Sequence, residues 1–392
     1  MSPIYLKKRE ERRIKAGHLW VFSNEIDTAR SPIKGSQAGS QVTVHASNGE
    51  QLGWGYLNPA SLISVRLLQR GRAEPASMSD VFTKRLSAAL AWRDSCFDQP
   101  YYRLVHSEGD YLPGVVIDRF GDYLVVQIST AGIEAFKTEL VRALQDLLSP
   151  RGILIRNDAR GRALEGLPMG EPELLGGWPK ELDVYEGDCH FKLPADGGQK
   201  TGWFYDQRPN REAFLRWAPG KRVLDVFSYI GGWGIQAAKA GAESVTCIDG
   251  SQSVCDQVTA NAKLNEVDVE VICKDAFKAL SALKADGRVF DSIVVDPPAL
   301  IQKKKDQKNG TQAYQRLNEL ALDCLAPGGV LVSASCSHHL AASELYSVVR
   351  RAANKRGKEA SVIAKSGAGL DHPVHPAIPE TEYLKTVFTK IQ

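Results

Sequence analysis

The chain has 392 residues, and at roughly 100–200 residues per domain this length predicts two or three domains. Hydrophobic residues make up 43% of the chain and charged residues 24%, as in average globular proteins, which excludes a disordered or fibrous chain. The formal net charge is only +3, but residues 1–73 carry eleven Lys and Arg against five Asp and Glu. This local excess of positive charge favours a polyanionic partner.

Seven cysteines are scattered along the chain, and none forms a Cys-x-x-Cys pair, so a zinc or dithiol redox site is not expected. An odd number of cysteines in a chain that can bury its own core predicts reduced thiols in the cytosol. The N-terminus lacks the apolar stretch of a signal peptide, and no long apolar run that could span a membrane occurs. We therefore expect a cytoplasmic protein with no membrane contact and no metal.

The N-terminal part consists of short apolar stretches separated by turn residues. Alternation predicts a strand at 42–46 (VTVHA), and further strands are expected at 51–57 and 61–69. The Gly, Asn and Ser residues between these stretches predict turns. This part is expected to form a small β-barrel or sandwich.

The middle part mixes the periods of helices and strands. Residues 73–80 are typical of a linker, and a helix is predicted over 81–94. A hairpin over 111–130, a helix over 133–148 and a strand over 152–158 follow. This order predicts a compact α+β unit.

From about residue 190 onward, strands and helices alternate. Continuous apolar runs predict five strands: 223–228, 244–250, 269–275, 292–298 and 329–336. A helix is expected over 313–325, ended by a turn at 326–329. Strands this apolar are buried on both faces, so we expect a doubly wound parallel sheet of the α/β class.

Polar side chains stand where these strands end. Asp225, Asp249, Asp275 and Asp296 lie at four strand ends, and Cys336 lies at the fifth. In an open α/β sheet, ligands bind outside the carboxyl ends of the strands, near the point where the strand order reverses. The sequence therefore predicts a functional site at this edge of the sheet.

Two nucleotide cofactors compete for the glycine cluster after the first strand. Residues 232–237 (GWGIQA) fit the dinucleotide pattern G-x-G-x-x-G/A, but that pattern places its first glycine directly after the strand. Here Asp225 and five further residues precede Gly231. A carboxylate at this place would repel a pyrophosphate and attract the ammonium and sulfonium groups of S-adenosylmethionine. We expect S-adenosylmethionine, with Asp249 on the ribose hydroxyls and Asp275 on the adenine amino group.

The thiol of Cys336, together with Asp296-Pro297-Pro298, indicates the reaction. C5 of a pyrimidine is a poor nucleophile, and a thiolate that adds to C6 turns the ring into an enamine whose C5 can attack a methyl sulfonium. Such a thiol must be partly exposed and have a lowered pKa, which the end of a strand allows. Asp296 is the nearest candidate for the base that removes the C5 proton. Five other cysteines are expected to be structural: Cys189, Cys247, Cys255, Cys273 and Cys324.

Several basic side chains are expected to contact RNA phosphates, with a contribution that falls as salt rises. One group follows Asp296-Pro-Pro and would lie over the rim of the site, and the other lies near the N-terminus. These expected RNA-binding residues are Lys303, Lys304, Lys305 and Arg208, together with Lys7, Lys8, Arg12 and Arg13.

The chain resembles bacterial large-subunit ribosomal-RNA cytosine-5 methyltransferases. The resemblance rests on residues 199–208 (QKTGWFYDQR), residues 223–234 (VLDVFSYIGGWG), Asp296-Pro-Pro and Ser335-Cys336-Ser337. Residues 104–127 resemble the central domain of that family, and 17–22 (GHLWVF) resemble its PUA domain. One departure is Ala299, which stands where the family often has a Lys directly after the two prolines.

The resemblance implies an α/β class I methyltransferase sheet, preceded by a small α+β domain and an N-terminal PUA-like β-barrel. The implied domains are residues 1–73 (PUA-like), 74–189 (central α+β) and 190–392 (methyltransferase). It also implies methylation of C5 of a cytosine in ribosomal RNA, with Cys336 as the nucleophile. The residues expected to bind the cofactor are Asp225, Phe227, Tyr229, Gly231, Gly232, Asp249, Ser251, Asp275, Ala276, Asp296 and Gln207.

Other functions stay open on the sequence alone. Transfer to C5 of a uracil would use the same thiol chemistry. A non-catalytic RNA-binding assembly factor could keep the fold, although the series of carboxylates and the thiol argue against it. A small-molecule methyltransferase would not need the basic N-terminal part. The sequence is also compatible with a homodimer.

Overall fold

The computed structural model describes residues 1–72, 74–159, 161–195 and 202–392. Residues 199–201 of the family-like segment therefore lie outside the described residues, as does Ala73 at the first expected domain boundary. Contacts within the chain define two compact units. The first unit comprises Met1–Leu182, Ala195–Gly202 and Leu370–Thr381, and the second unit comprises Asp183–Pro194, Trp203–Gly369 and Glu382–Gln392. The division into three domains stays a prediction.

A five-stranded sheet forms the N-terminal part of the first unit. Its strands are β1 (Ser2–Tyr5), β2 (Trp20–Phe22), β3 (Gln41–His45), β4 (Gln51–Leu57) and β5 (Ile63–Arg70), with a short helix α1 (Glu11–Lys15). The order is β1-β3-β4-β5-β2, in which β1 and β3 are parallel and the other pairs are antiparallel. The three predicted strands correspond to β3, β4 and β5. Alternate residues of β3 are buried, whereas β4 is buried from Leu52 to Leu57 and β5 from Ser64 to Leu68. The short strands β1 and β2 were not predicted.

A second five-stranded sheet, in the order β10-β9-β8-β7-β6, follows in the same unit. Its elements are α2 (Met78–Cys96), β6 (Tyr101–His106), β7 (Val115–Phe120), β8 (Tyr123–Ile128), α3 (Ala131–Glu134), α4 (Lys137–Leu148), β9 (Gly152–Arg156), α5 (Gly161–Leu164) and β10 (Glu173–Gly176). Helix α2 begins three residues before the predicted start, because the Ser77 side chain accepts a hydrogen bond from the backbone N–H of Asp80. The helix predicted over 133–148 is two helices, interrupted at residues 135 and 136.

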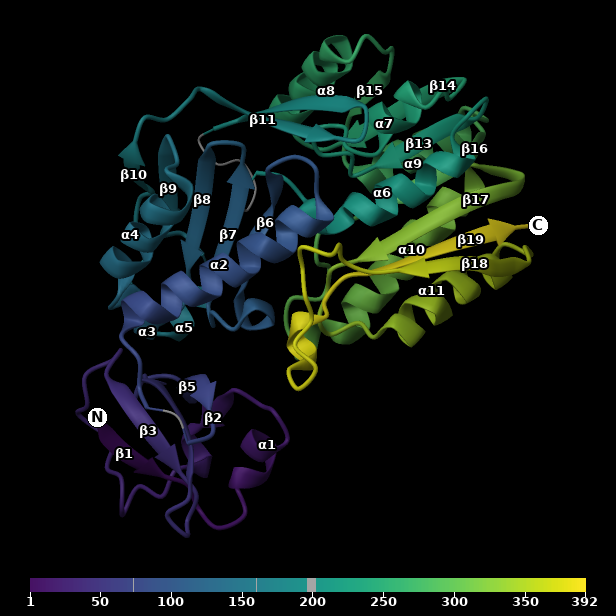
Figure 1. The fold of residues 1–392 in the computed structure, drawn as a ribbon. Helices are drawn as coiled ribbons and strands as arrows, with labels where there is room; N and C mark the ends of the chain where they lie inside the picture. The colour runs from purple at the N-terminus through teal and green to yellow at the C-terminus, as the bar shows by residue number, and fades with distance from the viewer. Residues whose placement is uncertain (73, 160, 196–201) are drawn as a thin grey trace. The chain divides into compact units, whose positions relative to one another are not determined.

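The second unit contains a seven-stranded sheet in the order β15-β14-β13-β16-β17-β19-β18 (Figure 1). Its strands are β13 (Arg222–Val226), β14 (Ser244–Asp249), β15 (Glu270–Cys273), β16 (Phe290–Val295), β17 (Leu325–Ser335), β18 (Ala360–Ser366) and β19 (Lys385–Ile391). The five strands predicted from apolar runs are the five parallel ones. The strand order reverses at β13, which lies between β14 and β16, so the expected binding edge lies there.

Helices and a β-hairpin complete the second unit. They are β11 (Glu181–Glu186), β12 (Cys189–Pro194), α6 (Arg208–Phe214), α7 (Gly234–Lys239), α8 (Gln252–Leu264), α9 (Ala276–Ala285), α10 (Gln307–Asp323) and α11 (Ala342–Lys355). The buried residues of α9, α10 and α11 form one hydrophobic core with the parallel strands. Helices α7 and α8 pack against β12 of the hairpin.

Two features of this sheet differ from the sequence-based expectation. The turn predicted at 326–329 lies inside β17, which bulges there: Leu325 pairs with Phe290, but Val330 is the next residue to pair, with Ser292. Gly328, at φ +76°, allows this bulge. The antiparallel strands β18 and β19 were not predicted, so the sheet is mixed rather than purely parallel.

Candidate active site

The carboxyl ends of the parallel strands bring the predicted side chains to one edge of the sheet. Asp225 lies in β13 and Asp249 is the last residue of β14. Asp296 follows β16 directly, and Cys336 follows β17 directly. Asp275 lies two residues after β15 and is the N-cap of α9. The five positions expected to form the site therefore share this edge of the second unit.

Asp225 is a fully buried carboxyl with one oxygen held by the protein. Its Oδ2 accepts a hydrogen bond of 2.9 Å from the backbone N–H of Gly234, while its Oδ1 has no hydrogen-bond partner among the described residues. Burial, together with the nearby charges of Asp296 and Asp249, raises the pKa of Asp225 to about 7, although the hydrogen bond from Gly234 lowers it. A cationic ligand at Oδ1 would satisfy both the unpaired oxygen and the unfavourable charge, so this residue fits the ammonium of S-adenosylmethionine.

The loop after β13 has an unusual backbone. Phe227 and Tyr229 adopt positive φ angles of 66° and 48°, and Gly231 has a φ of 92°. Non-glycine residues in this region are strained, and such strain is concentrated at ligand sites. Asp249 holds the loop, because its Oδ2 accepts from the Tyr229 backbone N–H and its Oδ1 accepts from that of Ser251, both at 3.1 Å. The predicted cofactor-binding residues of the two strand ends are thereby joined.

Gly234 shows why glycine is needed at the start of α7. A Cβ at this position would lie 2.5 Å from Cys247 Sγ and 3.3 Å from Asp225 Oδ2. The first distance is well inside van der Waals contact, so only glycine lets the helix start pack against β13 and β14 and donate to Asp225.

Asp296 is connected to both β13 and the glycine-containing loop. Its backbone N–H donates to Val226 O at 3.3 Å, and its Oδ2 accepts from Trp233 Nε1 at 3.2 Å. Trp233 is itself buried. The carboxylate is thus oriented from the loop that follows β13.

Cys336 is partly exposed and lies between two serines that the core holds in place. Ser335 Oγ donates to the hydroxyl of Tyr314 at 2.9 Å, and this hydroxyl lies 3.0 Å from Ser337 Oγ. Ser337 Oγ also accepts from the Ile301 backbone N–H at 3.2 Å. The sequence analysis missed Tyr314, because a tyrosine on the apolar face of a helix is indistinguishable from an ordinary core residue.

The other cysteines differ from Cys336 in their environment. Cys189, Cys247, Cys255 and Cys324 are buried, and burial raises the pKa of each thiol, to about 11 for Cys189 and Cys324. Burial and a raised pKa fit the structural role expected for these four cysteines. Cys273 was also expected to be buried but is exposed, because its strand β15 is at the edge of the sheet.

Several other predicted residues have clear structural roles. Asp275 Oδ1 accepts from the Lys278 backbone N–H and so caps α9, in which Ala276 is the first residue. Gln207 is buried, and its Oε1 accepts from Asn210 Nδ2. Arg208 forms an ion pair with the buried Glu186, with 3.6 Å between Nε and Oε2, and Glu186 is also paired with Arg211 at 2.5 Å.

The predicted lysines after Asp296 lie beside a basic groove. Lys303, Lys304 and Lys305 are exposed. A groove of about 610 Å³ is lined by the start of α10, the turn before it and α11: Lys304, Lys305, Gln307, Lys308, Thr311, Gln312, Gln315, Glu344 and Arg351. Four basic side chains face one acidic side chain there. Arg351, on α11, was not predicted and lies 3.1 Å from Gln315 through its Nε.

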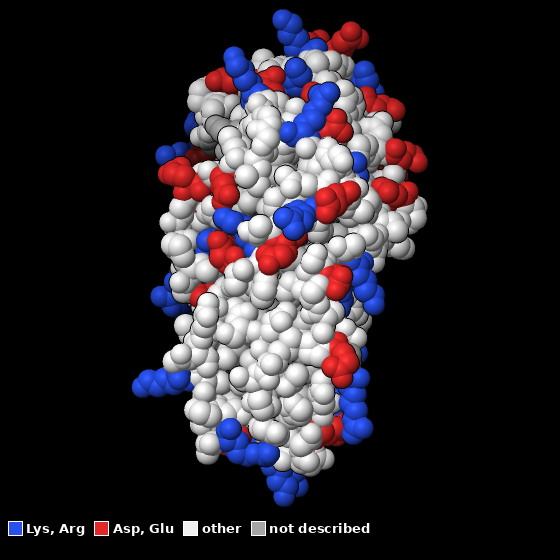
Figure 2. Space-filling view, turned by 60° about the vertical axis from the view of Figure 1, so that its left-hand side comes forward, with Lys and Arg blue, Asp and Glu red and all other residues white. Residues whose placement is uncertain are grey.

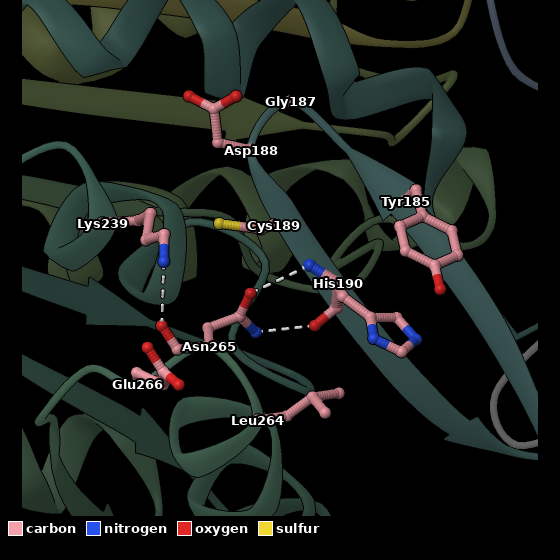
Figure 3. Close-up of a pocket in the computed structure, with 9 residues that line it drawn as sticks. All are labelled: Tyr185, Gly187, Asp188, Cys189, His190, Lys239, Leu264, Asn265 and Glu266. Atoms are coloured by element: carbon pink, nitrogen blue, oxygen red, sulfur yellow. Dashed lines mark hydrogen bonds between the residues drawn. The ribbon is translucent and has the colours of Figure 1, made fainter.

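A second hollow, of about 330 Å³, lies at the other ends of α7 and α8 (Figure 3). Its lining includes Lys239 at the end of α7, Leu264 at the end of α8 and Asn265. Asn265 hydrogen-bonds to both the backbone N–H and the carbonyl of His190 in β12. Because these helices begin at the carboxyl edge of the sheet, their ends lie away from Asp225. This hollow is therefore not the predicted cofactor site.

The N-terminal basic residues in the first unit differ in how far they are available. Lys7 Nζ donates to Asn24 O at 2.7 Å, and Arg13 forms an ion pair of 3.2 Å with Glu25. Lys8 and Arg12 are exposed. Figure 2 shows acidic and basic side chains close together over the upper part of the face drawn, whereas much of its lower part carries neither.

Two family models match the chain. One, described as a PUA-like domain, matches residues 4–70, and the other, described as an S-adenosylmethionine-dependent methyltransferase, matches residues 139–355, more than half of the chain. The chain belongs to the S-adenosylmethionine-dependent methyltransferase family. This match decides between the two cofactors in favour of S-adenosylmethionine. The two matches together confirm the predicted class I methyltransferase fold with an N-terminal PUA-like domain.

Similar proteins cover the methyltransferase almost from end to end. It is 36% identical over 393 residues to ribosomal RNA large subunit methyltransferase I of Photobacterium profundum, with 98% of each chain covered. The protein of the same name from Cronobacter sakazakii is 36% identical over 392 residues, with 97% of each chain covered. Among solved structures, a putative methyltransferase from Streptococcus mutans has a TM-score of 0.81 at 20% identity and covers 100% of both chains, which shows a common fold.

Two structural findings concern other kinds of site. Among the described residues of the methyltransferase, no helix combines the length and the apolar character needed to cross a bilayer. Within the same residues, His, Cys, Asp and Glu side chains nowhere gather in a group of three or more that could hold a metal ion.

Proposed function

We propose that this methyltransferase transfers a methyl group from S-adenosylmethionine to C5 of a cytosine in large-subunit ribosomal RNA. One observation carries the proposal: Cys336, a partly exposed thiol, follows β17 at the edge of the sheet where Asp225, Asp249 and Asp296 lie. The names of the relatives described above support ribosomal RNA as the substrate.

Cys336 makes C5 of the cytosine reactive. S-adenosylmethionine, when bound, supplies an electrophilic methyl group. The Cys336 thiolate adds to C6, its electron pair forms the S–C6 bond, and the π electrons of C5=C6 become available at C5. Once C5 carries the methyl group, a base removes the C5 proton, and the electron pair of that C–H bond re-forms C5=C6 as the S–C6 bond breaks. The electron pair of the S–C6 bond returns to the sulfur.

Asp296 accepts the C5 proton in this proposal. It follows β16, the strand directly beside β17, so it lies at the neighbouring strand end to Cys336. The hydrogen bond from Trp233 Nε1 to its Oδ2 leaves the carboxylate in a fixed orientation. Geometry and orientation are the first requirements for a general base.

The RNA must present an accessible base and be held by its backbone. A ring carbon can be reached only in an unpaired base or in one that is flipped out of its stack. The groove between α10 and α11 supplies basic side chains for phosphates, and Ile301, whose N–H is fixed to Ser337, lies only three residues before Lys304. An RNA strand leaving the thiol would therefore meet this groove.

Replacement of Cys336 tests the proposal. We expect Cys336→Ala to lower methyl transfer to ribosomal RNA by at least about a hundredfold, because the addition to C6 is lost. The measurement is transfer of labelled methyl groups, with the labelled nucleotide mapped and identified by mass spectrometry. The matched control is Cys273→Ala, which removes an exposed thiol at the far edge of the sheet and should keep activity.

Two results would contradict the proposal. Full methylation by Cys336→Ala would exclude the covalent mechanism, and 5-methyluridine as the product would show a uracil substrate. Cofactor binding to Cys336→Ala, measured by titration calorimetry, should equal that of the unchanged protein, so a folding defect is distinguished from a chemical one.

A further inference from the structure

Lys385 is a half-buried lysine near Cys336, and the sequence analysis did not consider it. It is the first residue of β19 and pairs with Ser335, the last residue of β17. Its Nζ donates a 2.6 Å hydrogen bond to the carbonyl of Ser337. The ammonium of Lys385 is therefore hydrogen-bonded to Ser337, the residue after Cys336. The backbone of Lys385 lies opposite Ser335, the residue before Cys336.

The surroundings of Lys385 make its charge effective at Cys336. Burial lowers the pKa of Lys385 to about 8, although Cys336 and Glu382 raise it. The hydrogen bond to the Ser337 carbonyl keeps the ammonium next to the residue that follows Cys336. Glu382 is exposed, whereas Lys385 is half-buried. Tyr314 also faces Cys336 from α10, and its burial raises its pKa, so it stays a neutral hydroxyl. His338 follows in the loop and lies against the ring of Tyr383.

We propose that Lys385 is a positioning residue that stabilises the thiolate of Cys336. Its hydrogen bond to Ser337 holds the ammonium beside the sulfur, in a partly buried place where a positive charge acts strongly on a neighbouring anion. This inference rests on the proposed function, because it assigns a role in preparing the nucleophile of that reaction.

Lys385 stabilises the sulfur anion at two steps of the proposed reaction. Before addition, the S–H bond of Cys336 breaks, its electron pair stays on sulfur, and the proton passes to water. The Lys385 ammonium lowers the free energy of this thiolate and so increases its population. When the S–C6 bond breaks at the end, the same ammonium stabilises the sulfur as a leaving group. Below its pKa of about 8, Lys385 keeps its proton throughout these steps.

The test is the pH dependence of Cys336 alkylation. The full-length protein without RNA is treated with iodoacetamide at pH 6 to 10, and the alkylated Cys336 peptide is quantified by mass spectrometry. We expect Lys385→Met to raise the midpoint of this curve by about one pH unit or more, which is about a tenfold loss of thiolate near neutral pH. Lys385→Arg should keep a midpoint near that of the unchanged protein.

Controls separate charge from structure. Lys390→Met removes an exposed lysine from the same strand and should leave the Cys336 curve unchanged, and the exposed Cys273 serves as a reference thiol in every sample. Binding of S-adenosylmethionine by each variant shows that it is folded. A Lys385→Met curve that coincides with that of the unchanged protein overturns the inference, as does an upward shift in Lys385→Arg equal to that in Lys385→Met.

The proposed function fails in a different way. Methylation of RNA by Cys336→Ala would show that Cys336 is not the nucleophile. That result would leave the alkylation midpoints of Cys336 in the unchanged protein and in Lys385→Met as they are. An unshifted midpoint in Lys385→Met, combined with an inactive Cys336→Ala, would overturn only the role of Lys385.

Discussion

At the scale of single residues, Asp225 links burial to cofactor binding. Its carboxyl group is fully buried, and only Oδ2 is hydrogen-bonded within the described residues. Because burial raises its pKa to about 7, Asp225 holds a proton in the free protein below that pH. A cationic ligand favours the charged carboxylate, so binding in mildly acidic solution must displace this proton.

This coupling predicts that S-adenosylmethionine binds more weakly as the pH falls. Between pH 7 and pH 5.5, the ionised fraction of a group with a pKa near 7 falls about fifteenfold, and the apparent affinity should fall by a similar factor. The amino group of the cofactor stays protonated over this range. Calorimetry in buffers of different ionisation enthalpy should show release of up to about one proton at pH 5.5. Asp225→Asn should bind more weakly at pH 7 and lose this pH dependence; an unchanged dependence would contradict the role of Asp225.

The same pKa shift affects stability in the opposite direction. The usual pKa of an aspartate is about 3.8, so between that value and about 7 the folded protein keeps a proton that the unfolded chain has lost. The contribution of Asp225 to the free energy of unfolding is therefore complete below pH 3.8 and is lost as the pH rises through 7. Binding of a cation at Oδ1 offsets this loss.

At the scale of elements, the sequence predicted the parallel strands but not the residues that surround the Cys336 thiol. Apolar runs identified the five parallel strands, and their ends identified Asp225, Asp249, Asp296 and Cys336, because strand polarity alone brings these ends together. Tyr314 and Lys385 could not be predicted. Both come from elements distant in sequence, and their contacts depend on how α10 and the unpredicted strand β19 pack beside β17.

At the scale of elements, we predict that the groove between α10 and α11 binds RNA phosphates. Lys304→Ala with Lys308→Ala should weaken RNA binding and lower the slope of log affinity against log salt by about 1.4, because two phosphate contacts are lost. The measurement is a binding titration at several salt concentrations. Lys263→Ala with Lys390→Ala removes the same charge from exposed positions outside the groove and should not change the slope. Equal effects of the two double variants would show that only net charge matters.

At the scale of the whole molecule, the two compact units divide the work in this account. The carboxylates and the thiol belong to the second unit, while the excess of basic residues belongs to the N-terminal part of the first. The sequence indicated this division by a change from short strands to alternating strands and helices. It could not indicate that Leu370–Thr381, near the end of the chain, packs within the first unit, because that contact is distant in sequence.

The first unit is predicted to contribute affinity rather than chemistry. Lys8→Ala with Arg12→Ala should weaken RNA binding severalfold, because exposed cations there contact phosphates. The affinity for S-adenosylmethionine and the rate at saturating RNA should stay unchanged. Lys7 and Arg13 are less suitable positions, since both make contacts within the protein. A loss of the saturated rate would contradict this separation of roles.

Trapping the covalent intermediate tests the account most directly. RNA that contains 5-fluorocytidine has no proton to lose at C5, so after methylation the thioether to C6 cannot be eliminated. Incubation with S-adenosylmethionine should give a stable protein–RNA complex, and mass spectrometry of its peptides should locate the nucleotide on Cys336. The absence of any adduct from RNA whose unfluorinated counterpart is methylated, or an adduct on another residue, would contradict the account.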